Sequence, residues 1–151
     1  MFRLARRIVG NEAVAEEILQ ESYMSLWSRQ GRTYPSNPEA WLMKTSVNRS
    51  IDYLRRRNVR KETDFNEDRT DGNEAPAYCG PARWELEALL DSALQRLAPR
   101  ERAAFVLKRL EGYSYEEISV ITGVALSTVR NQVMNAGRKV EDVFREAGVE
   151  P

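Results

Sequence analysis

The sequence predicts an all-α protein made of two small helical domains joined by a flexible acidic linker. Apolar residues recur at spacings of three and four along most of the chain, and no segment alternates as a half-buried strand would. Residues 61–81 break this pattern with two Pro, two Gly and six acidic residues, which is typical of a linker. We therefore expect one domain over residues 1–60 and a second over 82–147.

Two helices are expected at the start of the first domain. The first ends at Gly10, and Asn11 is well suited to cap a second helix over residues 12–29. The expected buried face of the second helix consists of Val14, Ala15, Ile18, Leu19, Tyr23, Leu26 and Trp27. Its other side is acidic.

A third helix is predicted from a start signal at Asn37, Pro38 and Glu39, which combine a capping residue, an N1 proline and an acid in the first turn. It is expected to run to about Arg57. Its core side comprises Leu42, Val47, Ile51 and Leu54. Its outward side comprises Lys44, Asn48, Arg49, Asp52, Arg55 and Arg56.

The second domain is expected to begin with two helices that meet at Pro99. The helix before Pro99 carries the apolar residues Trp84, Leu86, Leu90, Ala93, Leu94 and Leu97. The helix after it ends at Gly112 and carries Ala103, Val106, Leu107 and Leu110. Ser114 and Glu117 then have the spacing of a capping box, so another short helix starts there.

Residues 113–140 predict a helix-turn-helix, with Gly123 as the turn. The second helix places an apolar stripe on one side: Leu126, Val129, Val133, Ala136 and Val140. The polar side chains off this stripe are Ser127, Thr128, Arg130, Asn131, Asn135, Arg138 and Lys139, and no acid lies between Glu117 and Glu141. A helix of this kind fits the major groove of DNA.

Composition argues against an enzyme. The chain has no His and a single cysteine, Cys79, so it lacks the usual ligands of zinc and the usual base of a nucleophile. We expect no catalytic residue, no metal and no cofactor. No apolar run approaches the roughly 20 residues that cross a bilayer, and the cysteine usage fits a cytoplasmic protein. The net charge is zero, but residues 1–61 carry twelve basic and six acidic residues, which suits contact with phosphate.

Both domains resemble bacterial RNA polymerase sigma factors, specifically the small extracytoplasmic-function (ECF) group. In the first domain the resemblance rests on Glu16 to Tyr23, Ala40 to Lys44, Asn48 and Asp52 to Arg57. In the second it rests on Leu97 to Arg102, Leu110 to Ile118 and Ser127 to Arg130. The two blocks occur in the family's order across nearly the whole chain.

The resemblance implies roles for individual residues. The acidic helix face of Glu16, Glu17, Gln20 and Glu21 is expected to dock on the coiled coil of the largest subunit of core polymerase. The third helix is expected to meet the minus-ten promoter element and assist strand opening: Asn48 would capture an unstacked base, and the residues expected on backbone phosphates are Lys44, Arg49, Arg55, Arg56 and Arg57. Trp41, beside Leu42, is assigned to the core rather than to base stacking.

The helix-turn-helix is expected to read the minus-thirty-five element. The base-edge candidates are Ser127, Thr128, Arg130, Asn131 and Asn135, and the phosphate candidates are Arg138 and Lys139. An anti-sigma partner is a further hypothesis by resemblance. Two departures from the family stand out. Members usually start with more helix before Phe2, so this chain is expected to be shortened or its start assigned late. Ala125 replaces a capping Ser or Thr, for which Ser127 is expected to compensate by shifting the helix start.

The residues of the second domain, taken alone, leave two alternative functions open. A two-component-type regulator has a similar helix-turn-helix, but it needs a receiver domain, whereas residues 1–60 are helical and basic. A DNA-binding regulator that acts without polymerase would bind duplex DNA tightly by itself.

Overall fold

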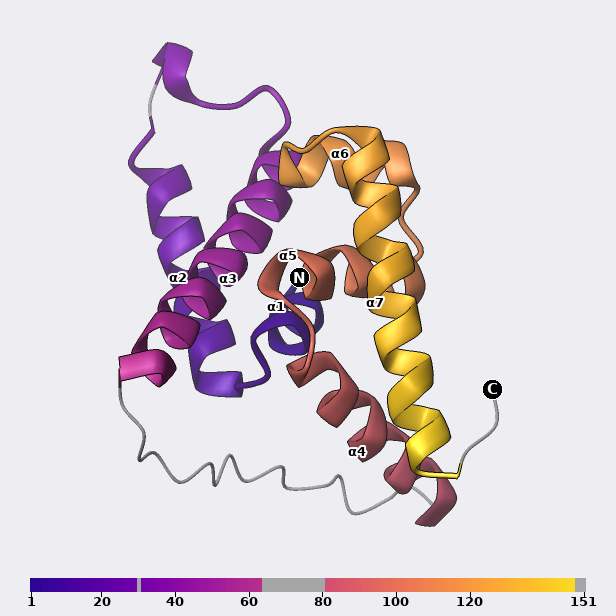
Figure 1. Cartoon of the computed structure of the whole chain (residues 1–151). Helices are drawn as coiled ribbons and strands as arrows, with labels where there is room; N and C mark the ends of the chain where they lie inside the picture. The colour runs from indigo at the N-terminus through magenta and orange to yellow at the C-terminus, as the bar shows by residue number, and fades with distance from the viewer. Residues whose placement is uncertain (30, 64–80, 149–151) are drawn as a thin grey trace.

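The computed structural model describes residues 1–29, 31–63 and 81–148, and these ranges contain helices and no strand (Figure 1), which confirms the predicted fold class. The predicted linker lies outside the described residues except at its ends. The first part of the chain forms α1 (Phe2–Val9), α2 (Glu12–Trp27), the short 3-10 turn η1 (Gly31–Thr33) and α3 (Pro38–Thr63). The second part forms α4 (Pro81–Gln95), α5 (Pro99–Phe105), the π-helical turn η2 (Val106–Leu110), α6 (Tyr115–Thr122) and α7 (Leu126–Glu146). We call α1–α3 the first module and α4–α7 the second.

Three helix starts are held by the predicted side-chain caps. Asn11 accepts the backbone N–H of Val14 at 3.2 Å, and Asn37 accepts that of Ala40 at 3.2 Å. Ser114 accepts the backbone N–H of Glu117 at 3.1 Å. Each bond satisfies a first-turn donor that the helix itself cannot pair, so these boundaries follow from local sequence.

Three helices differ from the prediction. The helix α3 continues to Thr63, beyond its expected end near Arg57 and into the first residues of the predicted linker. The helix that starts at Pro99 widens into the π-helical turn η2 before it ends at Gly112, which has a φ of 78°. At α7 the helix begins at Leu126 with Ala125 as N-cap and no side-chain cap bond. The expected shift of the start to Ser127 is therefore wrong.

The predicted core face of α3 is buried, but part of that of α2 is not. Leu42, Val47, Ile51 and Leu54 are all buried. Tyr23 and Trp27 of α2 were expected inside, yet Trp27 is 80% exposed. The buried residues of α2 form a narrow stripe of Ala15, Ile18, Ser22 and Leu26, and Tyr23 and Trp27 lie beside it, so helical spacing alone overestimated the width of the buried face.

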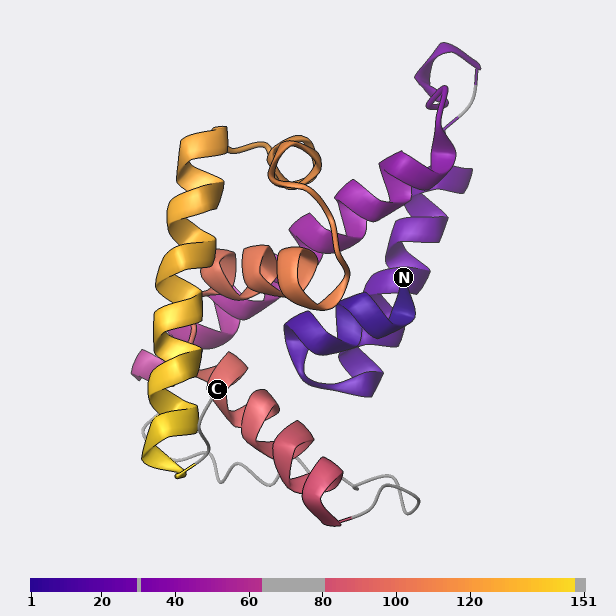
Figure 2. The ribbon, with the colours of Figure 1, turned by 90° about the vertical axis from the view of Figure 1, so that its right-hand side faces the viewer.

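One hydrophobic cluster joins the two modules. Leu4 and Ile8 of α1 and Ile51 of α3 belong to the same buried cluster as Phe105 of α5 and Val129 of α7. In Figures 1 and 2, α3 runs beside α5 and α6, with α7 on the far side of them. The modules therefore pack against each other through their apolar faces; we call this the packed arrangement.

Polar contacts also cross between the modules. Glu111 forms ion pairs with Arg3 at 3.5 Å and Arg7 at 3.4 Å. Asn48 of α3 donates its side-chain N–H to the backbone oxygen of Ile121 in α6 at 3.4 Å. These contacts fix how the second module sits on α1 and α3.

Arg102 is a buried cation between the modules. It is 5% exposed, and its Nη2 donates to the backbone oxygen of Arg7 at 3.3 Å. Its Nε has no hydrogen-bond partner among the described residues. The pKa of Arg102 is lowered to about 10, mainly because burial disfavours the charged form and also because of repulsion from Arg57, whereas attraction to Asp91 partly offsets both effects. The group stays charged at neutral pH, so the packed arrangement carries an incompletely paired charge.

Candidate nucleic-acid interface

The outer side of α7 presents all seven polar residues that the sequence singled out. Ser127, Asn131, Asn135 and Arg138 follow one another at helical spacing and form an exposed stripe. The other three, also exposed, are Thr128, Arg130 and Lys139. The buried residues of α7 lie on the opposite side against α5 and α4, so the stripe is held rigidly toward solvent.

Two of the basic residues on α7 have partners within the second module. The guanidinium of Arg130 lies 5.7 Å from the ring centroid of Tyr115, and Lys108 approaches the same ring at 4.4 Å. Lys139 forms an ion pair with Glu101 at 2.8 Å. Arg130 is thereby held at the edge of the stripe, whereas Lys139 is directed toward α5 and is less available to a phosphate than Arg138.

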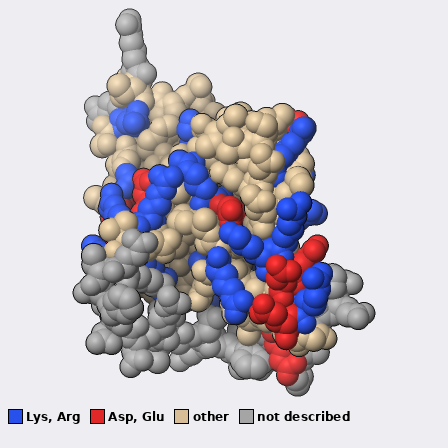
Figure 3. Space-filling view, in the orientation of Figure 1, with Lys and Arg blue, Asp and Glu red and all other residues tan. Residues whose placement is uncertain are grey.

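Basic and acidic side chains lie in different regions of one face of the molecule. In Figure 3, Lys and Arg side chains are spread across the face that carries α3, α5 and α7, whereas Asp and Glu gather at the lower end of α7. The acids at that end are Glu141, Asp142 and Glu146. Phosphate contact is thus favoured along the start of α7 and disfavoured at its end.

The structure divides the predicted cations of α3 between two sides. Lys44 and Arg55 lie on the same side of the helix as Asn48. Arg49 and Arg56 lie next to that side. Arg57 lies on the other side, where it lines a small cavity together with Arg102. In the packed arrangement Arg57 therefore lies apart from the other residues of α3 that were predicted to contact phosphates.

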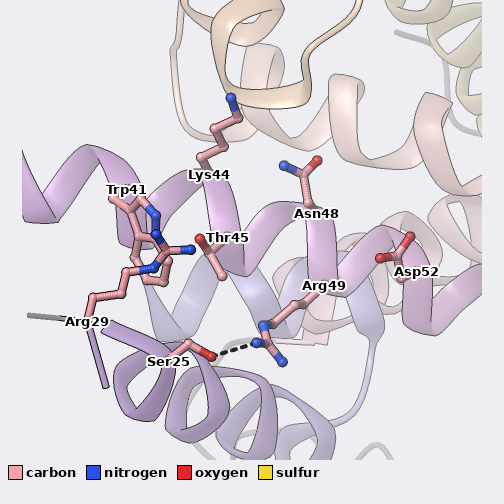
Figure 4. Close-up of a pocket in the computed structure, with 8 residues that line it drawn as sticks. All are labelled: Ser25, Arg29, Trp41, Lys44, Thr45, Asn48, Arg49 and Asp52. Atoms are coloured by element: carbon pink, nitrogen blue, oxygen red, sulfur yellow. Dashed lines mark hydrogen bonds between the residues drawn. The ribbon is translucent and has the colours of Figure 1, made fainter. Parts of the chain in front are cut away.

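Asn48 lines a pocket of about 420 Å³ between the end of α2 and the middle of α3 (Figure 4). The lining residues are Ser25, Arg29, Trp41, Lys44, Thr45, Asn48, Arg49 and Asp52. In Figure 4, Lys44 and Asn48 point away from α2, while Arg49 reaches toward it. The pocket offers an aromatic face, an amide and several cations, which are the groups that hold an unstacked base and its phosphate.

Three interactions position the walls of this pocket. The guanidinium of Arg29 lies 4.9 Å from the ring centroid of Trp41. Arg49 donates to Ser25 Oγ at 2.8 Å and to Glu21 Oε2 at 3.0 Å. Trp41 is only partly buried, and it lines the pocket. The prediction that it belongs to the core therefore holds only in part.

Sequence analysis missed Arg29, Ser25 and Thr45 as pocket residues. Arg29 comes just after α2 ends and belongs to no periodic face, and Ser25 and Thr45 are small polar residues within helices. Only the crossing of α2 over α3 brings them together, so no signal along the chain could have identified them.

The acidic side of α2 is exposed and continues into an apolar patch. Glu16, Glu17 and Gln20 are exposed, whereas Glu21 is paired with Arg49. Met24 and Trp27 follow on the same side and are 72% and 80% exposed. Exposed large apolar residues beside charged ones mark a protein-binding surface, and sequence analysis had assigned Trp27 to the core instead.

The described residues contain no group of three or more His, Cys, Asp or Glu side chains placed to hold a metal ion. None of the described helices has the length and apolar content that crossing a membrane requires.

Comparison with known proteins matches both modules to one family. A model described as Sigma-70 region 2 matches residues 1–60, and one described as Sigma-70, region 4 matches residues 87–140. The chain is 34% identical over 147 residues to the ECF RNA polymerase sigma factor SigE of Mycolicibacterium smegmatis, covering 94% of this chain and 56% of that protein. It is 32% identical over 146 residues to the RNA polymerase sigma factor CarQ of Myxococcus xanthus, covering 95% of this chain and 82% of CarQ.

Two solved structures share the fold. One is the sigma factor RpoE of Bartonella quintana in complex with the anti-sigma factor NepR, with a TM-score of 0.70 and 23% identity over 95% of this chain and 89% of that one. The other is the extracytoplasmic function sigma factor SigJ of Mycobacterium tuberculosis, with a TM-score of 0.62 and 23% identity over 93% of this chain and 49% of that one. The chain thus spans about half the length of some relatives and most of others.

Proposed function

Because the chain belongs to the extracytoplasmic-function group of RNA polymerase sigma factors, we propose that it binds core polymerase and directs initiation at particular promoters. The observation that carries this proposal is the presence, on one chain, of a base-sized pocket on α3 and an exposed polar stripe on α7. The chain would act beside polymerase in the cytoplasm and catalyse no reaction itself.

The stripe on α7 is the proposed reader of the minus-thirty-five element. Ser127, Arg130 and Asn131 are near the start of the helix, which enters a major groove most deeply. Arg138, about two turns beyond Asn131, would contact a phosphate and position the helix without reading sequence.

The pocket on α3 is the proposed site of strand capture at the minus-ten element. A base drawn from the duplex loses its stacking, and the pocket can replace that loss by contact with Trp41 and hydrogen bonds to Asn48. Lys44 and Arg49 border the pocket and can hold the adjoining phosphates. Arg55 and Arg56 extend this cationic face along α3.

The exposed side of α2 is the proposed docking surface for core polymerase. Glu16, Glu17 and Gln20 provide charge that orients a basic partner helix, and Met24 and Trp27 provide the apolar area that holds it. Glu21, although predicted to dock, would have to leave Arg49 before it could contact a partner.

Recognition of both promoter elements requires the two modules to separate. The names of the elements place them about 25 base pairs apart, or about 85 Å of B-form duplex. A packed chain of 151 residues has a radius of gyration of only about 15 Å, hence a diameter near 40 Å. The packed arrangement is therefore proposed to be a resting form that cannot contact both elements at once.

An anti-sigma factor is a proposed regulator. The support is that one protein sharing the fold was solved as a complex with an anti-sigma factor. Pull-down from a native extract tests this; recovery of polymerase alone would count against such a partner.

Run-off transcription with purified core polymerase and a genomic promoter library tests the sigma function. We expect a discrete set of transcripts that depends on the chain. Trp27→Ala should weaken binding to core polymerase about tenfold if Trp27 anchors the docking surface. Leu86→Ala, which truncates an exposed residue of α4, is the control and should leave core binding unchanged.

A regulator that acts without polymerase is the alternative. It predicts tight, sequence-specific binding of duplex DNA by the isolated chain and no complex with core polymerase. The sigma assignment is rejected if the chain does not bind core polymerase.

A further inference from the structure

A small cavity lies between α3 of the first module and α4 and α5 of the second. Its volume is about 30 Å³, which is room for one or two particles of the size of a water molecule. Its polar lining consists of Arg57, Asn58, Gln95 and Arg102, and none of the described residues that line it is acidic. Two positive charges thus border one small space between the modules.

The guanidinium of Arg102 is held in place from the side of α1. Its Nη2 donates to the backbone oxygen of Arg7 at 3.3 Å. A Cβ at Gly10 would lie 3.0 Å from the same Nη2, so the guanidinium packs directly against the turn between α1 and α2. Arg102 is therefore positioned beside the cavity before any ligand arrives.

The contacts of Arg102 leave its charge only partly compensated. The side chain is 5% exposed, the oxygen of Arg7 is neutral, and Nε has no hydrogen-bond partner among the described residues. Burial and repulsion from Arg57 lower the pKa of Arg102, whereas attraction to Asp91 raises it. Asp91 is not among the residues that line the cavity. A buried cation of this kind is destabilising until an opposite charge reaches it.

From this geometry we propose that the cavity binds a small inorganic anion of the size of chloride. Guanidinium and side-chain amide N–H groups are the donors that anions accept, and hydrogen bonds from a guanidinium to an anion are the stronger kind. The volume is too small for a phosphate ester or a nucleotide. Asn58 and Gln95 are exposed, so the cavity can exchange ions with solvent at their side. This site does not depend on the proposed sigma function.

Two other occupants are possible rivals of a free anion. Water can accept hydrogen bonds from the arginines, but it brings no negative charge to balance them. A carboxylate of the chain itself would bring that charge, since residues 62–81 hold six acids and one Arg. The experiment must separate a free ion from both.

An anion in this cavity would favour the packed arrangement. Arg57 and Asn58 belong to the first module and Gln95 and Arg102 to the second, so the complete set of donors exists only while the modules lie together. A ligand that binds one of two states shifts the population toward that state. This consequence rests on the proposed separation of the modules, whereas binding of the anion does not.

Thermal unfolding of the full chain in potassium chloride and in potassium isethionate, at equal ionic strength, measures binding. Isethionate is an organic anion too large for the cavity. With a dissociation constant of about 20 mM, chloride at about 200 mM raises the ratio of folded to unfolded protein about elevenfold. The melting temperature should then be higher in chloride by about 3–6 °C. Broadening of the chloride-35 resonance by the protein measures the ion directly.

Matched variants locate the site. Arg57→Gln and Asn58→Leu remove one donor group each and should reduce the difference between the two salts to less than half. Arg109→Gln, at an exposed arginine that does not line the cavity, should keep the full difference. Neither Arg57 nor Asn58 is buried, so both variants are expected to fold. Single-molecule energy transfer between labels on α2 and α7 should show a smaller separated population in chloride than in isethionate.

The proposal is overturned if the two salts give the same melting temperature, which leaves water as the occupant, or if Arg57→Gln and Arg109→Gln respond alike. It is also overturned if the difference appears only when the acids of residues 62–81 are replaced by amides, because the chain's own carboxylate then fills the cavity. Run-off transcription tests the sigma function separately: its failure leaves the anion site standing, and loss of the chloride effect leaves the sigma function standing.

Discussion

At the scale of single residues, Asn48 has two incompatible uses. In the packed arrangement its amide N–H is directed to the backbone oxygen of Ile121, and at strand opening it would have to hydrogen-bond a captured base. The bond to Ile121 is long at 3.4 Å, so exchanging it for a bond to a base costs little. Asn48 is thus placed to act after the modules have separated.

Asn48→Ala is expected to impair strand opening more than initial promoter binding. Loss of one or two hydrogen bonds to a captured base corresponds to about a threefold to thirtyfold drop in the opening equilibrium. Permanganate reactivity of unpaired thymines measures opening, and gel shift at low temperature measures initial binding.

Arg130→Ala is the companion variant and should mainly weaken recognition of the upstream element, by about 1–3 kcal/mol. Truncating Arg130 leaves the pocket on α3 intact, so its opening equilibrium should change little once DNA is bound. Equal losses at both steps for both variants would contradict this division between the modules.

At the scale of helices, α7, like α5, begins without a side-chain cap. Ala125 has the extended backbone of an N-cap, with φ of −60° and ψ of 148°, but its side chain cannot accept a hydrogen bond from the first turn. Three other helices in the described ranges use Asn11, Asn37 and Ser114 for that purpose. The start of α7 is therefore less secured than these three helix starts.

Ala125→Ser should stabilise the protein by about 1 kcal/mol, which raises the melting temperature by about 2–4 °C for a chain of this size. Calorimetry or circular dichroism measures the change. Ala13→Ser, at an exposed position within α2, is the control and should be destabilising by a few tenths of a kcal/mol because Ser is a poorer helix former than Ala. A fall or no change in the Ala125→Ser melting temperature would show that the cap is not satisfied.

At the scale of the whole molecule, the contact between modules combines a shared apolar cluster with weak polar contacts. The ion pairs of Glu111 involve a carboxylate that is only 17% exposed, and Arg102 carries a buried charge whose Nε has no partner among the described residues. Apolar burial favours packing, whereas the incompletely paired cation opposes it. An interface balanced in this way suits the proposed separation of the modules on DNA.

Glu111→Gln should raise the separated population about twofold to fivefold, because it removes both ion pairs to α1, worth about 0.5–1 kcal/mol together. Single-molecule energy transfer between labels on α2 and α7 measures this population. Promoter affinity should rise in parallel if the packed arrangement competes with DNA.

Glu146→Gln is the matched control, since it breaks a pair with Arg96 at 3.3 Å that lies within the second module. It should leave the separated population unchanged. A similar response in both variants would show that the contacts of Glu111 with α1 do not hold the modules together.

Helix positions and the exposed polar stripe of α7 could be predicted from the sequence. Asn11, Asn37 and Ser114 cap helices through bonds to residues three positions away, so their effect is local. The stripe on α7 followed from helical spacing, because one buried side implies one exposed side. These features depend on near neighbours in the chain, which the sequence itself provides.

Only the tertiary structure decided which side each helix turns to another helix. It placed Arg57 between the modules, exposed Trp27, and brought Arg29 and Trp41 together with Asn48 to form a pocket. It also packed the two modules into one core, with a small cavity lined by Arg57 and Arg102 between them. These outcomes depend on contacts between residues far apart in the chain, whose sum no local pattern encodes. The sequence by itself thus determined the helices and the family, and the tertiary structure determined which of their surfaces are free to bind.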